Sequence, residues 1–213
     1  MFRTITIARE YGSGGAEVGR GVAEKLGWEL IDRSLIERVA AVGGVSPKTA
    51  AEFDEHAANW WKKLLSGYSH GGPELYVSTA GCGIIDEDSV HELTRSIIQQ
   101  AAEAGHCVIV GRGAQCCLRR RSDVLNVLVY APPQERIRRL QRRFPHQPEA
   151  AEMMRKIDSE RSRYIRDYYD HDWLDRNLYH LWVSTDLGIA AAVDIIICAA
   201  KTGRNHLSAP SAG

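Results

Sequence analysis

The sequence predicts an α/β protein built on a doubly wound, five-stranded parallel sheet, and three observations support that fold class. Short apolar, β-branched runs alternate along the chain with longer segments that have a helical period. The first such run ends in a glycine cluster and passes directly into a helix. The chain is also long enough for one α/β domain with a real core. Strands that alternate with helices are joined by right-handed crossovers, which give one parallel sheet with helices on both faces.

The first predicted strand begins at Ile5 and ends in the turn Gly12-Ser13-Gly14-Gly15. A helix follows, because Val18, Val22 and Leu26 recur every four residues. Strand, glycine turn and helix together aim backbone N–H groups at a phosphate. The glycines let the chain bend and let an anion approach, and the helix N-terminus adds positive potential.

This glycine loop lacks two residues of a complete phosphate-binding loop. The full pattern, G-x-x-x-x-G-K-[ST], places a lysine on the outer phosphates and a hydroxyl on magnesium. Here Gly15, Ala16 and Glu17 stand in that region instead. Two interpretations stay open: a modified phosphate site, or a glycine-rich turn that only lets helix and strand pack closely.

The second predicted strand, Trp28–Asp32, ends in a carboxylate at the edge where open α/β sheets place their ligand groups. Asp32 is therefore a candidate site residue, with a helix N-cap ahead of residues 34–42 as the alternative. Helical patterns follow to about residue 65, and residues 66–83 are a Gly-, Ser- and His-rich loop. We expect this excursion to form a helical flap over the strand ends.

The remaining predicted elements alternate regularly. They are a helix from Asp88 to Gly105, strands Cys107–Val110 and Val124–Tyr130, helices Glu135–Arg143 and Glu149–Tyr169, strand Leu178–Ser184 and helix Ile189–Ala200. We expect one domain over residues 1–201, with a helical insertion and its flanking helix at about 34–105. The polar, Pro- and Ser-rich residues 202–213 are expected to be a disordered tail.

The amino-acid composition limits the classes of partner that we expect. The 27 basic and 27 acidic residues balance, so no global field attracts nucleic acid or an anionic membrane. Most of the basic clusters at 119–121 and 136–143 are expected to be solvated helix faces. Five cysteines without a C-x-x-C pair favour a reducing cytosol. No signal peptide is visible, and residues 189–200 are too short to span a bilayer. We therefore expect a cytoplasmic protein.

Several short motifs occur in a distinctive order. They are Ile7-Ala8-Arg9-Glu10-Tyr11-Gly12-Ser13-Gly14-Gly15, Ile31-Asp32, Cys107-Val108-Ile109-Val110-Gly111-Arg112-Gly113-Ala114, Val129-Tyr130-Ala131-Pro132, Asp158-x-x-Arg161-x-x-Tyr164 and Ser184-Thr185-Asp186. By these motifs the chain resembles the cytidylate kinase-like family, a branch of the P-loop nucleoside monophosphate kinases. The resemblance runs from Ile5 to about Ala200.

The resemblance implies an adenylate-kinase-type fold with an insertion like the NMP-binding one and a helical lid at about 145–170. It implies phosphoryl transfer from ATP, with magnesium, to a nucleoside monophosphate such as CMP. The donor loop would be Gly12–Glu17, and Asp32 and Arg112 would bind the acceptor. Arg161, which matches the family motif, would be the first lid arginine and Arg166 the second, so that Arg112, Arg161 and Arg166 are the catalytic candidates.

The chemistry of its side chain also supports Arg112 as a phosphate-binding candidate, because it comes at the end of a strand and a guanidinium matches phosphate oxygens bidentately. The alternative role for Arg112 is a structural salt bridge. Metal ligands are unknown, since no histidine has ligand spacing, and magnesium held by phosphates and water needs no such signature. The partner is expected to be a nucleotide or a small phosphorylated molecule. The oligomeric state is open, with a homodimer among the alternatives.

Three hypotheses about function stay open, because the chain departs from cytidylate kinases at Gly15, Glu17 and Gly113. The first is an active kinase in which Arg9 or Arg20 partly replaces the missing lysine. The second is a non-catalytic nucleotide- or anion-binding protein with the same fold, and the third is a small-metabolite kinase. We expect weak, magnesium-dependent ATP binding with slow or no transfer to CMP. Gly15→Lys with Glu17→Thr is expected to strengthen ATP binding if the loop keeps the standard backbone.

Overall fold

The computed structural model describes residues 2–32, 87–145 and 149–203. By its internal contacts the chain divides into two units, residues 1–33 with 98–213, and residues 34–97. Of the second unit only residues 87–97 are described. The helices and loop predicted between residues 34 and 83, and most of the predicted tail, lie outside the described residues. None of the described helices is both long and apolar enough to cross a membrane.

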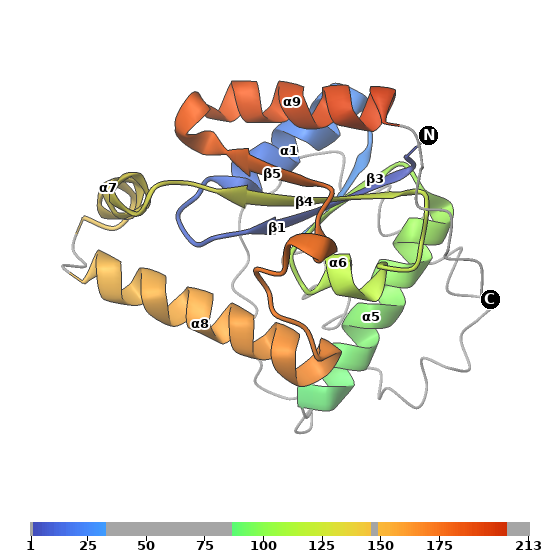
Figure 1. Ribbon diagram of the computed structural model, residues 1–213, viewed down its shortest axis with the longest axis horizontal. Coiled ribbons are helices and arrows are strands. Elements are labelled where there is room, and N and C mark those ends of the chain that lie inside the picture. The colour runs from blue at the N-terminus through green and yellow to red at the C-terminus, as the bar shows by residue number, and fades with distance from the viewer. Residues whose placement is uncertain (1, 33–86, 146–148, 204–213) are drawn as a thin grey trace, which may run out of the picture. The chain divides into compact units, whose positions relative to one another are not determined.

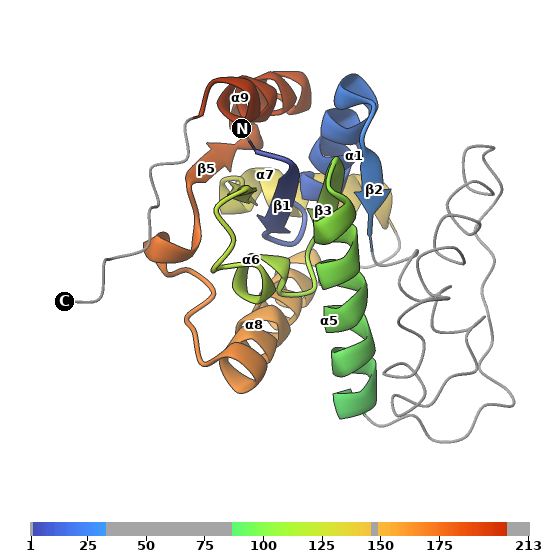
Figure 2. The same cartoon turned by 90° about the vertical axis from the view of Figure 1, so that its right-hand side faces the viewer.

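The sheet has five strands, all of whose pairings are parallel, in the order β2-β3-β1-β4-β5 (Figures 1 and 2). Their bounds are β1 Thr4–Arg9, β2 Glu29–Ile31, β3 Cys107–Val110, β4 Val124–Tyr130 and β5 Leu181–Ser184. The predicted fold class is confirmed. β1 lies at the centre, with strands added on both sides of it. The C-terminal end of β1 is therefore the switch point at which such sheets bind ligands.

Helices cover both faces of the sheet. Helix α1 (Gly15–Leu26) and helix α9 (Ile189–Thr202) lie on one face, and α6 (Ala114–Cys117) and α8 (Ala150–Tyr169) on the other (Figure 1). On the first face, Val18, Val22, Val193 and Ile196 pack against strand residues in the main core. On the second, Ile165 and Trp173 pack with Ala8 and Leu128. Helix α7 (Pro133–Arg143) follows β4, and α5 (Glu87–Ala104) precedes β3.

Apart from boundaries that shift by one or two residues, the described elements differ from the predicted ones at two places. The last strand begins at Leu181 rather than Leu178, because Arg176–Leu178 forms a 3₁₀ turn, η1. The Asp175 carboxylate accepts a 2.9 Å hydrogen bond from the Asn177 N–H and starts that turn. Helix α6 was not predicted, since four residues are too short to show a helical period.

Glu29 on β2 gives the fold a testable pH dependence. Burial raises its pKa from 4.5 to about 7. A carboxyl whose folded-state pKa is raised contributes stability that is full below the unfolded pKa and is lost as the pH rises through the folded one. We expect stability to fall from about pH 4.5 to about pH 7. Glu29→Gln should flatten this slope in urea titrations at several pH values. An unchanged slope would show that Glu29 is not responsible.

Candidate functional site

The loop after β1 ends in a helix whose N-terminus no side chain caps. Gly12 and Gly14 have φ of 79° and 80°, values that favour glycine. Gly14 is the N-cap of α1 and makes no side-chain cap hydrogen bond. Ser13 is buried, and its hydroxyl donates to the Glu10 carbonyl at 2.8 Å. The first-turn N–H groups of α1 are therefore left for a ligand or for water.

Two side chains from the C-terminal half of the chain hold the loop at Ser13. Arg139 of α7 donates to the Ser13 carbonyl at 2.8 Å. Thr185, in the 3₁₀ turn η2 (Thr185–Leu187) after β5, donates from its hydroxyl to the same carbonyl at 2.6 Å. Arg139 also donates to the Thr185 hydroxyl at 2.8 Å, so the three groups form one network. The Ser184-Thr185-Asp186 motif thus has a structural role at the glycine loop.

A buried ion network holds the loop at Glu10 and Tyr11. Asp158 of α8 accepts from the Tyr11 N–H at 2.8 Å and pairs with Arg136 of α7. Arg136 is only 5% exposed, donates to the Tyr11 carbonyl at 2.8 Å, and pairs with Glu10 at 3.2 Å. Burial raises the pKa of Glu10, and the Arg136 charge opposes that rise. The expectation of a solvated face is wrong for Arg136, because it is a buried tie between the loop, α7 and α8.

Arg161 connects α8 to the end of β1. Its Nη1 donates to the Arg9 carbonyl at 2.8 Å and lies 3.2 Å from Asp158. The guanidinium also lies over the Tyr11 ring, 5.6 Å from its centroid. Burial lowers the Arg161 pKa, and Asp158 opposes that shift. The Asp158-x-x-Arg161 motif therefore fastens the predicted lid helix to the glycine loop and the end of β1 through backbone groups.

Arg9 lies where two glycines leave room for it. A Cβ at Gly15 would overlap the Cβ and Cγ of Arg9, and a Cβ at Gly111 would overlap its guanidinium. The Arg9 side chain therefore runs from the start of α1 to the end of β3. This changes the expectation for Gly15→Lys, since a side chain at position 15 cannot be added without moving Arg9. Arg20, the alternative replacement for the missing lysine, is exposed on α1.

Three consecutive residues after β3 are left-handed. Gly111, Arg112 and Gly113 have φ of 80°, 59° and 70°. For a residue with a side chain this conformation costs about 1–2 kcal/mol. Residues strained in this way cluster at active sites and ligand-binding sites. A Cβ at Gly113 would lie 2.5 Å from a Tyr169 ring carbon. The Tyr169 ring thus explains why glycine, rather than a residue with a Cβ, stands at position 113.

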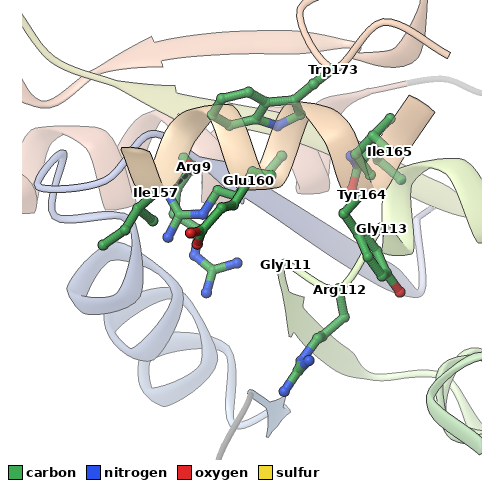
Figure 3. A pocket seen from close by; sticks show the side chains of 12 residues that line it. Arg9, Gly111, Arg112, Gly113, Ile157, Glu160, Tyr164, Ile165 and Trp173 are labelled. Carbon is green, nitrogen blue, oxygen red and sulfur yellow. Dashed lines mark hydrogen bonds between the residues drawn. The ribbon is translucent and has the colours of Figure 1, made fainter. Parts of the chain in front are cut away.

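These arginines meet at a cavity of about 260 Å³ between the ends of β1 and β3 and helix α8. It is lined by Arg9, Arg112, Arg161, Glu160, Gln115, Tyr164, Trp173 and smaller or apolar neighbours. Arg9, Ile157 and Glu160 lie at one end, and Tyr164 and Ile165 at the other (Figure 3). Burial raises the pKa of Tyr164 to about 12, so its hydroxyl stays protonated. The cavity is strongly cationic, with one carboxylate, and has aromatic walls.

The other predicted site residues lie at different distances from this cavity. Asp32 directly follows β2, and Arg112 follows the neighbouring strand β3 by two residues. Since Ile31 pairs with Ile109, both lie at the same edge of the sheet. Ala16 and Glu17 are exposed in the first turn of α1. Arg166 is exposed on α8 and does not line the cavity with Arg112 and Arg161.

Several residues of the site were not found from sequence. Arg136, Arg139 and Trp173 looked like parts of ordinary helix and loop segments. Their contacts with the loop and the cavity are tertiary. Only the density of arginine in the α7 segment could have drawn attention to them.

The uncapped α1 N-terminus predicts an anion in crystals of this protein. We expect a sulfate or phosphate ion on the N–H groups of Gly14 to Glu17 when crystals are grown in high concentrations of either salt, because backbone donors and the helix dipole both favour it. Diffraction data to ordinary resolution are enough to see it. A loop that stays filled by its own side chains under those conditions would contradict this prediction.

A comparison with protein families bears on the whole of this arrangement. The model of the cytidylate kinase-like family matches residues 4–187, which include the loop, the cavity and α8. The chain belongs to the cytidylate kinase-like family. A search of curated proteins found no match.

Solved structures support the fold of this family member. An uncharacterized protein from Eubacterium ventriosum has a TM-score of 0.68 and 20% identity, over 95% of this chain and 99% of the other. Shikimate kinase from Acinetobacter baumannii, in complex with shikimate, has a TM-score of 0.51 and 16% identity, over 96% and 97%. A gluconokinase from Sinorhizobium meliloti has a TM-score of 0.51 and 15% identity, over 93% and 91%. At these identities the similarity shows a P-loop kinase fold.

Proposed function

We propose that this protein is a phosphotransferase that takes a phosphoryl group from a nucleoside triphosphate at the Gly12–Glu17 loop. The acceptor is a small phosphorylated molecule, such as CMP, in the neighbouring cavity. The observation that carries the proposal is the position of Arg9, whose side chain lies over the start of α1 and reaches Gly111 at the cavity. It supplies a cation between the two places where the donor and acceptor would lie.

Arg9 can supply much of the positive charge that the missing lysine would provide. Phosphoryl transfer needs positioning and positive charge around the transferred group rather than covalent chemistry. A guanidinium remains charged at all relevant pH values and can bind two phosphate oxygens at once. Because Arg9 comes from β1 and not from α1, this cation does not need a side chain at position 15. Arg161 adds a second cation, but one of its N–H groups is already bound to the Arg9 carbonyl.

The residues at the loop fit ATP and magnesium, which the family implies. Phosphate oxygens suit the uncapped N–H groups of α1, and hard oxygen ligands suit magnesium. Glu17 lies close to the loop, since a Cβ at Gly14 would lie 3.7 Å from its Oε2. Its carboxylate can hold magnesium directly or through water, and magnesium bound there would neutralise phosphate charge. Without the metal, Glu17 would repel the nucleotide, so binding is expected to depend on magnesium.

Arg112 is proposed to bind the acceptor phosphate, and Arg112→Ala tests this. Loss of a charge-assisted hydrogen bond should weaken the binding of CMP by about 1.5–3 kcal/mol. Cytidine, which lacks the phosphate, should be nearly unaffected. Calorimetry on the unmodified protein and the variant measures both ligands. An equal loss for CMP and cytidine, or failure of the variant to fold, would favour the structural salt bridge.

Two alternatives share the same site. In the first, the protein binds nucleotide without turnover, which the exposed Glu17 carboxylate at the phosphate site favours. In the second, the acceptor is a hydroxyl of a small metabolite, and Glu160, a carboxylate that lines the cavity, favours that chemistry because a hydroxyl needs a base.

A thermal-shift and turnover panel separates the three functions. It would test ATP and GTP with nucleoside monophosphates, shikimate and gluconate as acceptors, each with and without magnesium. Slow, magnesium-dependent turnover with a nucleoside monophosphate supports the proposal. Stabilisation by nucleotides without turnover selects the binding protein, and turnover only with a hydroxyl acceptor selects the metabolite kinase.

A further inference from the structure

A second cavity, of about 340 Å³, lies at the opposite edge of the sheet from the donor loop. Its lining includes Arg3 before β1, Trp28 before β2 and His106 before β3. Lys25 and Lys201, from the last turns of α1 and α9, complete its polar wall. Because these residues precede strands or end helices, the cavity belongs to the N-terminal edge of the strands. The proposed phosphoryl transfer does not use it.

The charge of this cavity is positive. Its lining contains Arg3, Lys25 and Lys201 and no carboxylate. Lys25 pairs with Asp194 at 2.7 Å, and Arg3 donates to the Ala104 carbonyl at 3.1 Å, so part of this charge is already compensated. The C-terminal ends of α1 and α9 offset a further part through their dipoles. Lys201 is exposed at the end of α9 and can still turn toward an anion.

Aromatic rings line the same cavity. Phe2 is buried, and the rings of Trp28 and His106 pack edge to face with centroids 5.5 Å apart. His106 is held in the left-handed region at φ 54°, where its carbonyl accepts from the Glu29 N–H at 2.9 Å. This conformation is unfavourable for a residue with a side chain, and here it accompanies an exposed imidazole against Trp28. The wall therefore combines flat apolar surface with cations, which suits a planar ring that bears a negative group.

We propose that this cavity binds a nucleotide-like ligand, a planar ring joined to a phosphate, with a nucleoside monophosphate as its simplest form. Lys201 and the neighbouring cations hold the phosphate, and Trp28 and Phe2 contact the ring. The volume is at the lower end of the range for small-molecule sites, which fits one nucleotide and no larger cofactor. This site is independent of the proposed phosphoryl transfer, although α1 begins at the Gly12–Glu17 loop and ends at this cavity.

Two tryptophans make the test selective. Trp28 lines this cavity and Trp173 lines the arginine cavity, so ¹⁹F NMR of the full chain labelled with 5-fluorotryptophan reports on each separately. Each resonance is assigned with a Trp→Phe variant. AMP should shift the Trp28 resonance in a saturable way, and adenosine should need a concentration at least about tenfold higher, since it lacks the charged group.

Charge variants complete the experiment. Lys201→Glu should weaken the AMP response of Trp28 by about tenfold or more, and Lys201→Arg should preserve it. Arg112→Ala should leave the Trp28 response unchanged. The second site would be overturned if the Trp28 resonance does not move up to millimolar AMP. It would also be overturned if that resonance responds to adenosine as strongly as to AMP, or if Lys201→Glu leaves its response to AMP unchanged. A Trp173 resonance that fails to respond would count against the proposed function alone.

Discussion

Arg136→Met should lower the free energy of unfolding by about 3–5 kcal/mol, the range for removing one partner of a buried ion pair. Arg136 is almost fully buried, and its loss leaves the carboxylates of Glu10 and Asp158 close together without their shared cation. It also removes the hydrogen bond to the Tyr11 carbonyl. Urea denaturation of the two proteins measures the difference. Arg138→Met is the matched control, because Arg138 lies on the same helix with its side chain 59% exposed and should change stability by less than about 0.5 kcal/mol.

The same variant should show a characteristic pH dependence. Burial already raises the pKa of Glu10, and Arg136 opposes that shift. Without Arg136 the folded-state pKa rises further above its unfolded value, so the folded variant favours the protonated carboxyl. The stability deficit should therefore be largest near pH 8 and shrink as the pH falls toward 5. A deficit that is equal at both pH values would contradict the role given to Arg136.

Arg9→Met is expected to have the largest effect on activity. A cation or donor that acts on the transferring group typically contributes about 10²–10³ in turnover. Gly111→Ala should act in the same direction, because the added Cβ would occupy the position of the Arg9 guanidinium and displace it from the cavity. Arg20→Met, which removes an exposed arginine of α1, should leave turnover unchanged. Steady-state rates for the three variants measure this order, and equal rates in Arg9→Met and Arg20→Met would contradict it.

Gly15→Lys distinguishes the present geometry from that of a standard phosphate-binding loop. The sequence alone suggests that lysine at this position, with Glu17→Thr, would strengthen ATP binding. In the structure the added Cβ would overlap the Cβ of Arg9, which cannot swing away as the end of a flexible side chain can. The substitution would therefore add the lysine cation, but it would displace Arg9 and distort the loop.

The sequence predicted the parts of the fold that depend on local pattern. Strands β3 and β4 have the predicted bounds, because continuous apolar runs bounded by turn residues are distinctive of buried parallel strands. The long helix α8 was predicted to within one residue, at Ala150–Tyr169. The glycine loop was placed correctly before a helix, since strand, glycine cluster and helical period follow one another directly.

The candidate site was harder to predict because its contacts join distant segments. Asp158 lies 147 residues from Tyr11, and no local pattern shows that its carboxylate accepts the Tyr11 N–H. Arg161 was identified from its motif, but its hydrogen bond to the Arg9 carbonyl follows only from how α8 packs. Arg9 was one of two candidates for the missing cation. The space beside Gly15 and Gly111, which the Arg9 side chain fills, exists only in the folded chain.

Calorimetric titration of ATP tests most directly the claim that Arg9 completes the donor site. With magnesium, the unmodified protein should bind ATP weakly but measurably, and without magnesium binding should largely disappear because Glu17 then faces the phosphates alone. Arg9→Met should weaken the magnesium-dependent binding by about 1.5–3 kcal/mol, while Arg20→Met should not. Tight binding without magnesium, or equal affinity in the unmodified protein and Arg9→Met, would contradict this account.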